Sequence, residues 1–529
     1  MAEPSDATAR GHRWTLATPH ALATEAGAEA FEAGGNAADA ALAAAAVLAV
    51  AYPHQCGVGG DLFALATVPD GKVVSINASG AAPRGIDIEQ VRRAGGGRMP
   101  QHGPLTITVP GAVSGWAALH RHARLPFSDA FEGAVRLAED GVPVAPSVAA
   151  SLARHAERIL ADPGLRGVFA PEGRVLREGE PLRQPALAAT LRAVAEGGED
   201  AFYRGEVGRR FAAGLRAAGS PLDQEDLARH RAELDSAIAA RSGGLDVLVA
   251  PPNSQGFVLL ELLLATDHLG ADPDPFGPHA VLLAELARVT ARDRDRHNAD
   301  PRRVRVPLGT LLDEGHVVAL CDEARGLSAT GPPSGRRAGA GDTVGVVAAD
   351  AEGWAVSLLQ SHWSAWGSGI LEPRTGLLAH DRGNCFSLDP SSPNALEPGK
   401  RPAHTLTPAL VRREERLVAA LASRGGGGQP QILAQLMGRL FGRGMAPGAA
   451  LAAPRRLVHG MDVGRTDRWV QAESSAPAAA LAALEAAGYE VVRLPAPSEA
   501  VGHAHVLLAT DEGFAAAADP RSDGAAAAG

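Results

Sequence analysis

The stretch that decides the fold is residues 341–349 (GDTVGVVAA), followed by residues 354–361 (WAVSLLQS). Both segments are rich in β-branched and apolar residues, and the residues between them, 350–353 (DAEG), are typical of a turn. The pattern predicts a β-hairpin whose first strand opens at Thr343. Directly before it, residues 326–342 are rich in Gly, Pro, Ser and Arg and offer little for a core to bury. We therefore expect a cleavable linker that leads into the hairpin.

Helical and strand-like segments alternate along the rest of the chain. Residues 34–36 (GGN) split the Ala- and Leu-rich segment 21–52 into two predicted helices, and Asn36 or Asp39 can cap the second. The turn PDG at 69–71 predicts another hairpin, with strands over 62–67 and 73–76. Further predicted segments are mostly helices over 110–240, helices over 257–268, 279–296, 431–441 and 478–487, and strands over 244–250, 406–411, 417–421, 490–494 and 505–510. Helices that flank central hairpins indicate a layered α/β or α+β domain.

Composition excludes several classes of protein. The 529 residues carry 60 acidic and 50 basic side chains, a net charge of -10, which argues against a chain built to hold nucleic acid or an anionic membrane. Three cysteines are too few for a disulfide framework. The longest apolar run, residues 40–51, is short of the roughly 20 residues that a membrane span needs. Residues 1–13 lack a signal pattern, so we expect a cytoplasmic protein without nucleic-acid or membrane partners.

Common cofactor and metal motifs are missing from the sequence. It holds no GxxxxGK[ST] phosphate loop, no HExxH and no GxSxG elbow. The glycines of residues 57–60 (GVGG) follow a predicted helix rather than a strand, which indicates a packing loop. His503 and His505 flank one residue without a third ligand in register. We therefore expect neither a metal nor a cofactor.

The residues around Thr343 allow two interpretations. The ordinary one is a β-branched residue that begins a strand. The chemical alternative is autoproteolysis, in which the Thr343 hydroxyl attacks the carbonyl of Asp342 and leaves a nucleophile whose own α-amine can act as its base. Gly425 and Gly426 could supply backbone N–H groups to the oxyanion, although a run of glycines is also typical of a simple loop.

The order and spacing of several motifs decide between these readings. They are 34–40 (GGNAADA), 53–60 (PHQCGVGG), 109–116 (VPGAVSGW), 342–343 (DT), 353–357 (GWAVS), 367–369 (GSG), 398–402 (PGKRP) and 518–525 (ADPRSDGA). With them the chain resembles the γ-glutamyltranspeptidase (glutathione hydrolase) family of N-terminal nucleophile (Ntn) hydrolases, from about residue 20 to 527.

The resemblance implies an α+β fold, a four-layer αββα sandwich made as one precursor. A cut before Thr343 would give a large subunit, residues 1–342, and a small subunit, residues 343–529, which together form one domain and are each other's partners. Thr343 would be the nucleophile, with Gly425 and Gly426 in the oxyanion hole. Ser361 falls where the family has a hydroxyl that contacts the nucleophile's amine. No cofactor is implied.

The substrate pocket departs from the family pattern. The arginine that binds the glutamyl α-carboxylate falls at Ser79, and the acidic residue that binds the α-amino group falls at Cys385. The pocket asparagine falls at Trp363, and the two pocket serines fall at His404 and Thr405. Burying an unpartnered charge costs several kcal/mol, so the usual γ-glutamyl pose is not expected.

The altered pocket more closely resembles the branch that includes oxamate amidohydrolase and related acylases. In this chain Arg382, Arg424 or His404 would then bind an anionic or carbonyl group of a different acyl donor. The alternative is that these three residues are solvated or have a structural role. Arginine suits a carboxylate because its planar fork binds both oxygens.

The function predicted first is a self-processing amidohydrolase or acyltransferase of the γ-glutamyltransferase/glutathione hydrolase type, which cleaves a γ-glutamyl or related small acyl amide. One alternative is an oxamate-type hydrolase that uses water alone as acceptor. Another is an uncleaved, inactive family member that acts as a binding protein. Two departures from the family pattern favour this last alternative: Val344 and Gly345 stand where the family has Thr-His, and extra glycines surround Gly427. The cleavable linker before Thr343 opposes it.

Overall fold

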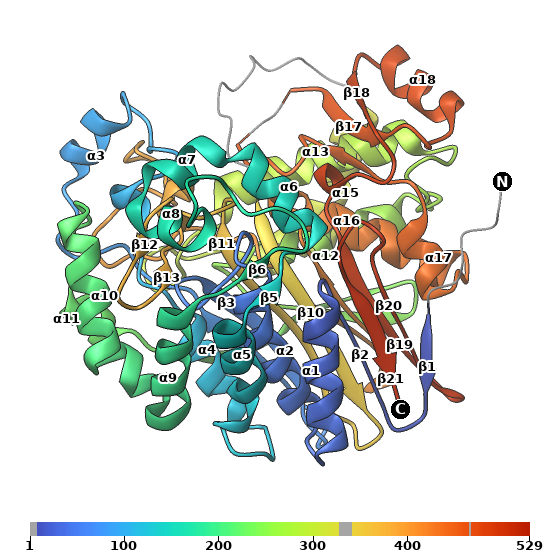
Figure 1. Cartoon of the computed structure of the whole chain (residues 1–529). Helices are drawn as coiled ribbons and strands as arrows, with labels where there is room; N and C mark the ends of the chain where they lie inside the picture. Colours follow the sequence, from blue (N-terminus) through green and yellow to red (C-terminus); the bar gives the residue numbers. More distant parts are fainter. Residues whose placement is uncertain (1–7, 327–340, 465–466) are drawn as a thin grey trace.

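Two seven-stranded sheets lie at the centre of the structure, a computed structural model that describes residues 8–326, 341–464 and 467–529 (Figure 1). We call them the β10 sheet and the β15 sheet. Every strand pair within both sheets is antiparallel. In spatial order the β10 sheet contains β21 (Ala525–Ala528), β2 (Trp14–Thr18), β10 (Asp342–Asp350), β11 (Ala355–Trp363), β3 (Asp61–Thr67), β4 (Val73–Ala78) and β7 (Glu233–Ser236). The β15 sheet contains β1 (Ala9–Gly11), β20 (Gly513–Ala518), β19 (Ala504–Thr510), β15 (Arg416–Ser423), β14 (Ala409–Arg413), β9 (Leu245–Val249) and β8 (Ile238–Ser242).

The predicted hairpin that opens at Thr343 is confirmed and forms the middle of the β10 sheet. Strands β10 and β11 pair antiparallel, with Gly345 opposite Leu359. Their side chains are buried on both faces, because the second sheet covers one face and helices cover the other. That double burial explains why β10 carries a near-continuous apolar run, whereas the polar side chains of β11 are also buried.

The two sheets share an apolar core. It combines Val347 and Leu359 of the β10 sheet with Leu410, Ala420 and Leu507 of the β15 sheet, all buried. A polar contact also crosses this core, because the Ser357 hydroxyl donates to the Leu421 carbonyl at 2.7 Å. The side chains of two inner faces thus interdigitate as in other sandwiches.

Helices cover the outer faces and complete four layers. The apolar helix α2 (Ala37–Ala51) is buried along its whole length and packs with its neighbours on the β10 sheet. Asn36 and Asp39 form the capping box that starts it, which confirms the predicted cap. On this side lie α1 (Ala21–Glu32), α4 (Ala112–His120), α5 (Asp129–Asp140), α6 (Pro146–Arg154), α7 (Ala156–Ala161), α8 (Pro163–Phe169), α9 (Pro185–Tyr203), α10 (Glu206–Ala217) and α11 (Gln224–Arg229) (Figure 1). Helix α3 (Ile88–Ala94) stands apart from them and packs in a separate apolar cluster with Phe386 and Leu388.

The β15 sheet is covered by a second set of helices. Leu259 and Leu263 of α12 and Ile432 and Leu436 of α16 pack on it, and α13 and α15 pack on α12 in turn. The elements are α12 (Gly256–His268), α13 (Ala280–His297), α14 (Leu308–Leu311), α15 (Glu314–Arg325), α16 (Gln429–Met437), α17 (Pro447–Ala452) and α18 (Ala478–Ala486), with β16 (Arg456–Val458), β17 (Trp469–Glu473) and β18 (Glu490–Leu494) beside α18. The predicted αββα sandwich is therefore the observed fold.

Some predicted segments differ from the structure. The region 110–240 also contains β5 (Val142–Pro143), β6 (Pro181–Leu182), β7 and part of β8. The predicted helix 431–441 is α-helical only to Met437 and continues as a π-helix over Gly438–Gly442. Most of the predicted linker, residues 327–340, lies outside the described residues. No helix in the described part of the chain is long and apolar enough to cross a membrane.

Candidate active site

Thr343 lies at the start of β10, next to Ser361 of the neighbouring strand. A register shift between Asp342 and Val344 marks a bulge at this point, and bulges commonly re-aim a side chain. The Thr343 hydroxyl donates to the Ser361 Oγ at 3.1 Å, and both side chains are buried. The predicted nucleophile and its hydroxyl neighbour therefore touch.

Ser361 joins the nucleophile to the predicted scissile bond. Its hydroxyl donates to the carbonyl oxygen of Asp342 at 2.5 Å and accepts the Trp363 N–H at 2.8 Å. A serine hydroxyl has one proton and two acceptor positions. All three are occupied, which fixes the direction of the chain of bonds: the Thr343 proton points to Ser361, and the Ser361 proton points to the Asp342 carbonyl.

The glycine loop after β15 faces the same peptide. Gly425 and Gly426 have φ values of 157° and 51°. A Cβ on Gly341 would come within 2.4 Å of the Gly426 Cα, so the loop and the segment before Thr343 lie in direct contact. A Cβ on Gly426 would lie 2.7 Å from the Met461 carbonyl oxygen. Only glycine satisfies both the backbone angle and the approach at Gly426.

Two backbone N–H groups of the glycine loop have no hydrogen-bond acceptor among the described residues. The N–H groups of Gly427 and Gly428 donate to Met461 and Gly425, whereas those of Gly425 and Gly426 donate to no acceptor among the described residues. The Gln255 amide braces the loop, because it donates to the carbonyl oxygens of Gly426 and Thr405 at 2.9 Å each. The N–H groups of Gly425 and Gly426 therefore lie in a loop that contacts Gly341, the residue before the Asp342–Thr343 pair.

Arg424 is held by the residue before the predicted cut. It is buried and pairs with the Asp342 carboxylate at 2.5 Å and with Glu499 at 3.4 Å. Two carboxylates therefore already compensate its charge. Arg424 is one of the three residues predicted to bind an anionic group, but in the structure its ion pair is with Asp342, next to the predicted cleavage site.

A small cavity of about 120 Å³ lies among the predicted pocket residues, and Asp342, Thr343 and Arg424 are not part of its lining. It is lined by three of the predicted pocket residues together with α13 and the loop after β16: Arg294, Asp295, Asn298, Cys385, Ser387, Ser392, Asn394, Ala403, His404, Thr405, Val463 and Gly464. Ser79 is not among these residues. It is fully buried and its hydroxyl donates to Asn77 Oδ1 at 2.7 Å.

Arg382 lies behind the wall of this cavity and is almost fully buried. Its guanidinium stacks 4.2 Å above the Trp363 ring, and Nη1 donates to the Thr405 hydroxyl at 3.3 Å and contacts the Cys385 sulfur at 3.6 Å. Its Nη2 has no hydrogen-bond partner in the part of the chain that the structure describes. Trp363 adopts a φ of 77°, which side-chain-bearing residues rarely do, and these contacts hold it there.

His404 is a neutral donor rather than a cation. Burial, and then the charge of Arg382, lower the pKa of His404 to about 3. Its Nε2 lies 3.2 Å from the Asp61 carboxylate, and His380 Nδ1 lies 3.5 Å from the same group. Burial opposes the charge of Asp61, yet His380 and His404 keep its pKa below the usual value. Of the three residues predicted to bind an anionic group, Arg382 is therefore the cation that forms no ion pair with a carboxylate among the described residues.

Two residues of this site were not predicted. Asp61 opens β3 directly opposite Ser361, and an acidic residue just before the apolar run LFALA is the signal that points to it. Gln255 stands in the loop 251–256 (PPNSQG), where a long amide before an apolar helix gave no signal on its own. The glycine loop and the pocket wall both depend on this amide.

A family model for gamma-glutamyltranspeptidase matches residues 23–529. The chain belongs to the gamma-glutamyltranspeptidase family. Family members with this similarity are hydrolases and transferases, so the chain is an enzyme of the glutathione hydrolase-like Ntn amidohydrolase type, as predicted.

Several members of the gamma-glutamyltranspeptidase family align with the whole chain. It is 38% identical to the oxamate amidohydrolase proenzyme of Klebsiella pneumoniae, over 96% of this chain and 97% of that protein. It is 34% identical to the glutathione hydrolase-like YwrD proenzyme of Bacillus subtilis, over 98% of each. The crystal structure of cephalosporin acylase from Bacillus halodurans superposes with a TM-score of 0.90 at 32% identity, over 99% of this chain and 97% of that one. These likenesses confirm the Ntn-hydrolase fold.

Proposed function

We propose that this gamma-glutamyltranspeptidase-family chain cleaves itself between Asp342 and Thr343 and then hydrolyses a small amide whose acyl group carries a carboxylate or carbonyl. Residues 1–342 and 343–529 would be the two subunits of the mature enzyme. Thr343 is the nucleophile, and its new α-amine is the base. Gly425 and Gly426 stabilise the oxyanion.

The contact chain from Thr343 through Ser361 to the Asp342 carbonyl carries this proposal. For the first step, the Thr343 hydroxyl attacks the Asp342 carbonyl carbon. The Ser361 hydroxyl at 2.5 Å is placed to stabilise the negative charge that develops on the carbonyl oxygen. The C–N bond breaks as the peptide nitrogen takes up the proton that the Thr343 hydroxyl has lost, which leaves a free α-amine on Thr343 and an ester between its Oγ and the Asp342 carbonyl carbon. Water then hydrolyses that ester, which frees the Thr343 hydroxyl and releases the Asp342 carboxylate.

The charges of the pocket support a small anionic donor over a γ-glutamyl group. Arg382 donates to the hydroxyl of Thr405, which lines the cavity, and its Nη2 has no partner among the described residues, so a carboxylate bound at Thr405 would lie next to an unpaired positive charge. An α-amino group would need an acidic partner, and the carboxylate that lines the cavity, Asp295, already accepts a hydrogen bond from Arg294 Nε at 2.9 Å. A donor with a carboxylate and no ammonium group leaves fewer charges unpaired. The oxamate amidohydrolase name of one relative agrees with this class of substrate.

The test is turnover of oxamate and glutathione by the same purified sample, with ammonia and glutamate release measured separately. We expect a higher kcat/KM for oxamate. Faster release of glutamate would assign the chain to γ-glutamyl chemistry and overturn the substrate proposal. An uncut chain without either activity would favour the inactive binding protein.

A further inference from the structure

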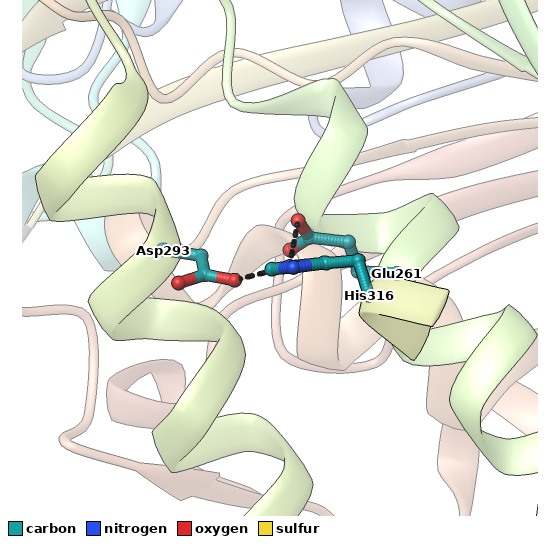
Figure 2. Close-up of side chains that lie close together, drawn as sticks. All are labelled: Glu261, Asp293 and His316. Carbon is teal, nitrogen blue, oxygen red and sulfur yellow. Dashed lines mark hydrogen bonds and ion pairs between the residues drawn. The ribbon is translucent and has the colours of Figure 1, made fainter. Parts of the chain in front are cut away.

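Three ionisable side chains from three helices meet far from Thr343 in the sequence. Glu261 of α12, Asp293 of α13 and His316 of α15 point toward one another (Figure 2). One ligand atom of each lies within 4.8 Å of the other two. His316 Nε2 is 2.7 Å from Asp293 Oδ2 and 3.8 Å from Glu261 Oε1. We call these residues the α12–α13–α15 cluster.

Glu261 is the side chain that the surrounding protein leaves unsatisfied. It is fully buried, and neither carboxylate oxygen has a hydrogen-bond partner among the described residues. Burial, and then the charge of Asp293, raise the pKa of the Glu261 carboxyl well above its usual range. A buried carboxylate is normally paired, hydrogen-bonded or bound to a metal. Here the Glu261 carboxyl points toward His316, which lies between it and Asp293 (Figure 2).

We propose that the α12–α13–α15 cluster binds one divalent transition-metal ion, Zn²⁺ or Mn²⁺. One imidazole nitrogen and two carboxylates form a mixed N/O donor set that suits these cations. Ca²⁺ and Mg²⁺ suit it poorly, because they favour all-oxygen shells of six or more ligands. The side chain of His316 is 23% exposed whereas those of Glu261 and Asp293 are buried. The ion therefore has a path from solvent on the histidine side.

The ion would tie together helices that support the active site. His316 lies in the first turn of α15, which Asp313 caps. Asp293 directly precedes Arg294, whose Nη1 donates to the Gly427 carbonyl at 3.2 Å. A metal held by this cluster would fix α13 against α12 and α15, and through Arg294 would steady the glycine loop. Its role is to stabilise the fold and not to carry the reaction.

The test uses the tag-free full chain, because a polyhistidine tag would itself bind metal. The protein is treated with chelator, desalted and titrated separately with Zn²⁺, Mn²⁺, Ca²⁺ and Mg²⁺. Bound metal per chain and the melting temperature are measured for wild type, Glu261→Gln and Asp293→Asn. Glu323→Gln is the matched control, because Glu323 also joins α13 to α15, through its ion pair with Arg292.

We expect wild type and Glu323→Gln to bind one equivalent of Zn²⁺ or Mn²⁺ and to melt at a higher temperature with it. Glu261→Gln and Asp293→Asn should weaken binding at least tenfold, as the loss of one of three ligands implies. Glu261→Gln replaces a buried carboxyl that has no hydrogen-bond partner among the described residues with an uncharged amide of the same shape, so its metal-free form should melt no lower than wild type. No metal bound by wild type, or equal binding by Glu261→Gln, would overturn the proposal, and so would a preference for Ca²⁺ or Mg²⁺.

Discussion

The Ser361 hydroxyl gives the sharpest prediction about self-cleavage. Ser361→Ala removes the donor that lies 2.5 Å from the Asp342 carbonyl oxygen and the acceptor for the Thr343 hydroxyl. Removal of one oxyanion donor costs about 3–4 kcal/mol of transition-state stabilisation, which corresponds to a rate that falls by about 10²–10³-fold. We expect maturation of this variant to slow by at least a hundredfold.

The assay follows precursor synthesised in a cell-free system and resolves it on denaturing gels over time. Ser361→Ala also leaves the buried Asp342 carbonyl without its partner, a cost of about 1–3 kcal/mol in stability, so melting temperatures must be recorded. Ser364→Ala is the matched control. That serine is also buried, and its Oγ has no hydrogen-bond partner among the described residues, so the control should mature at the wild-type rate. Equal maturation of Ser361→Ala and wild type would refute the reasoning.

Three further predictions follow from single side chains. Arg382→Gln should lower kcat/KM for an anionic amide by about 10–100-fold, since a charged hydrogen bond is worth about 1.5–3 kcal/mol. Self-cleavage of this variant should still proceed. An unchanged kcat/KM would exclude Arg382 as the residue that recognises the anionic group. Gly426→Ala should abolish cleavage and turnover because its Cβ would meet the Met461 carbonyl at 2.7 Å, whereas Gly444→Ala, also at positive φ but with no atom within 4 Å of its Cβ, should remain active. Burial and the charge of Arg455 lower the pKa of His505 to about 3, although Asp519 opposes the shift. The unfolded chain, where the histidine pKa is about 6.5, therefore binds a proton that the folded chain does not, and the folded state loses stability as the pH falls below about 6.5. His505→Leu should therefore recover about 2–3 kcal/mol of unfolding free energy near pH 4.5, and an unchanged acid limb in thermal melts would contradict this.

Local sequence patterns were sufficient for the central elements. The hairpin β10–β11 follows from two strand-like runs, the first rich in valine and the second in other apolar residues, around a turn, and α2 follows from an Ala-rich run after an Asn cap. The edges of the sheets were missed for physical reasons. Strand β21 is four alanines, which have little strand preference, and it forms because β2 offers a partner. Strand β7 is exposed throughout, so no alternation marks it.

Local patterns left the site residues open. The strand opening at Thr343 and the glycine run at Gly425–Gly426 each allowed an ordinary structural interpretation, and only the resemblance to the family favoured the catalytic one. Contacts between distant segments gave no such signal, because the pair of Asp61 and His404 depends on tertiary packing alone. The commitment of Arg424 to Asp342 likewise emerges only when β15 ends beside β10.

Gly345, a departure from the family's usual residue, has a packing cause. A Cβ there would lie 2.8 Å from the Ala422 side chain of the facing sheet. The glycine lets the two sheets approach closely beside Thr343. Gly345 is one of the departures that favoured an inactive protein, and the close packing of the two sheets accounts for it. The contact between Thr343 and Ser361 is present beside it.

The central claim is the cut before Thr343, and N-terminal sequencing of freshly purified protein tests it most directly. In proportion to their lengths in the 54.2 kDa chain, the products should run near about 35 and 19 kDa, and the smaller should begin Thr-Val-Gly. Thr343→Ala should leave one uncut band. A wild-type chain that stays whole over days, or a cut at any other peptide bond, would contradict the account.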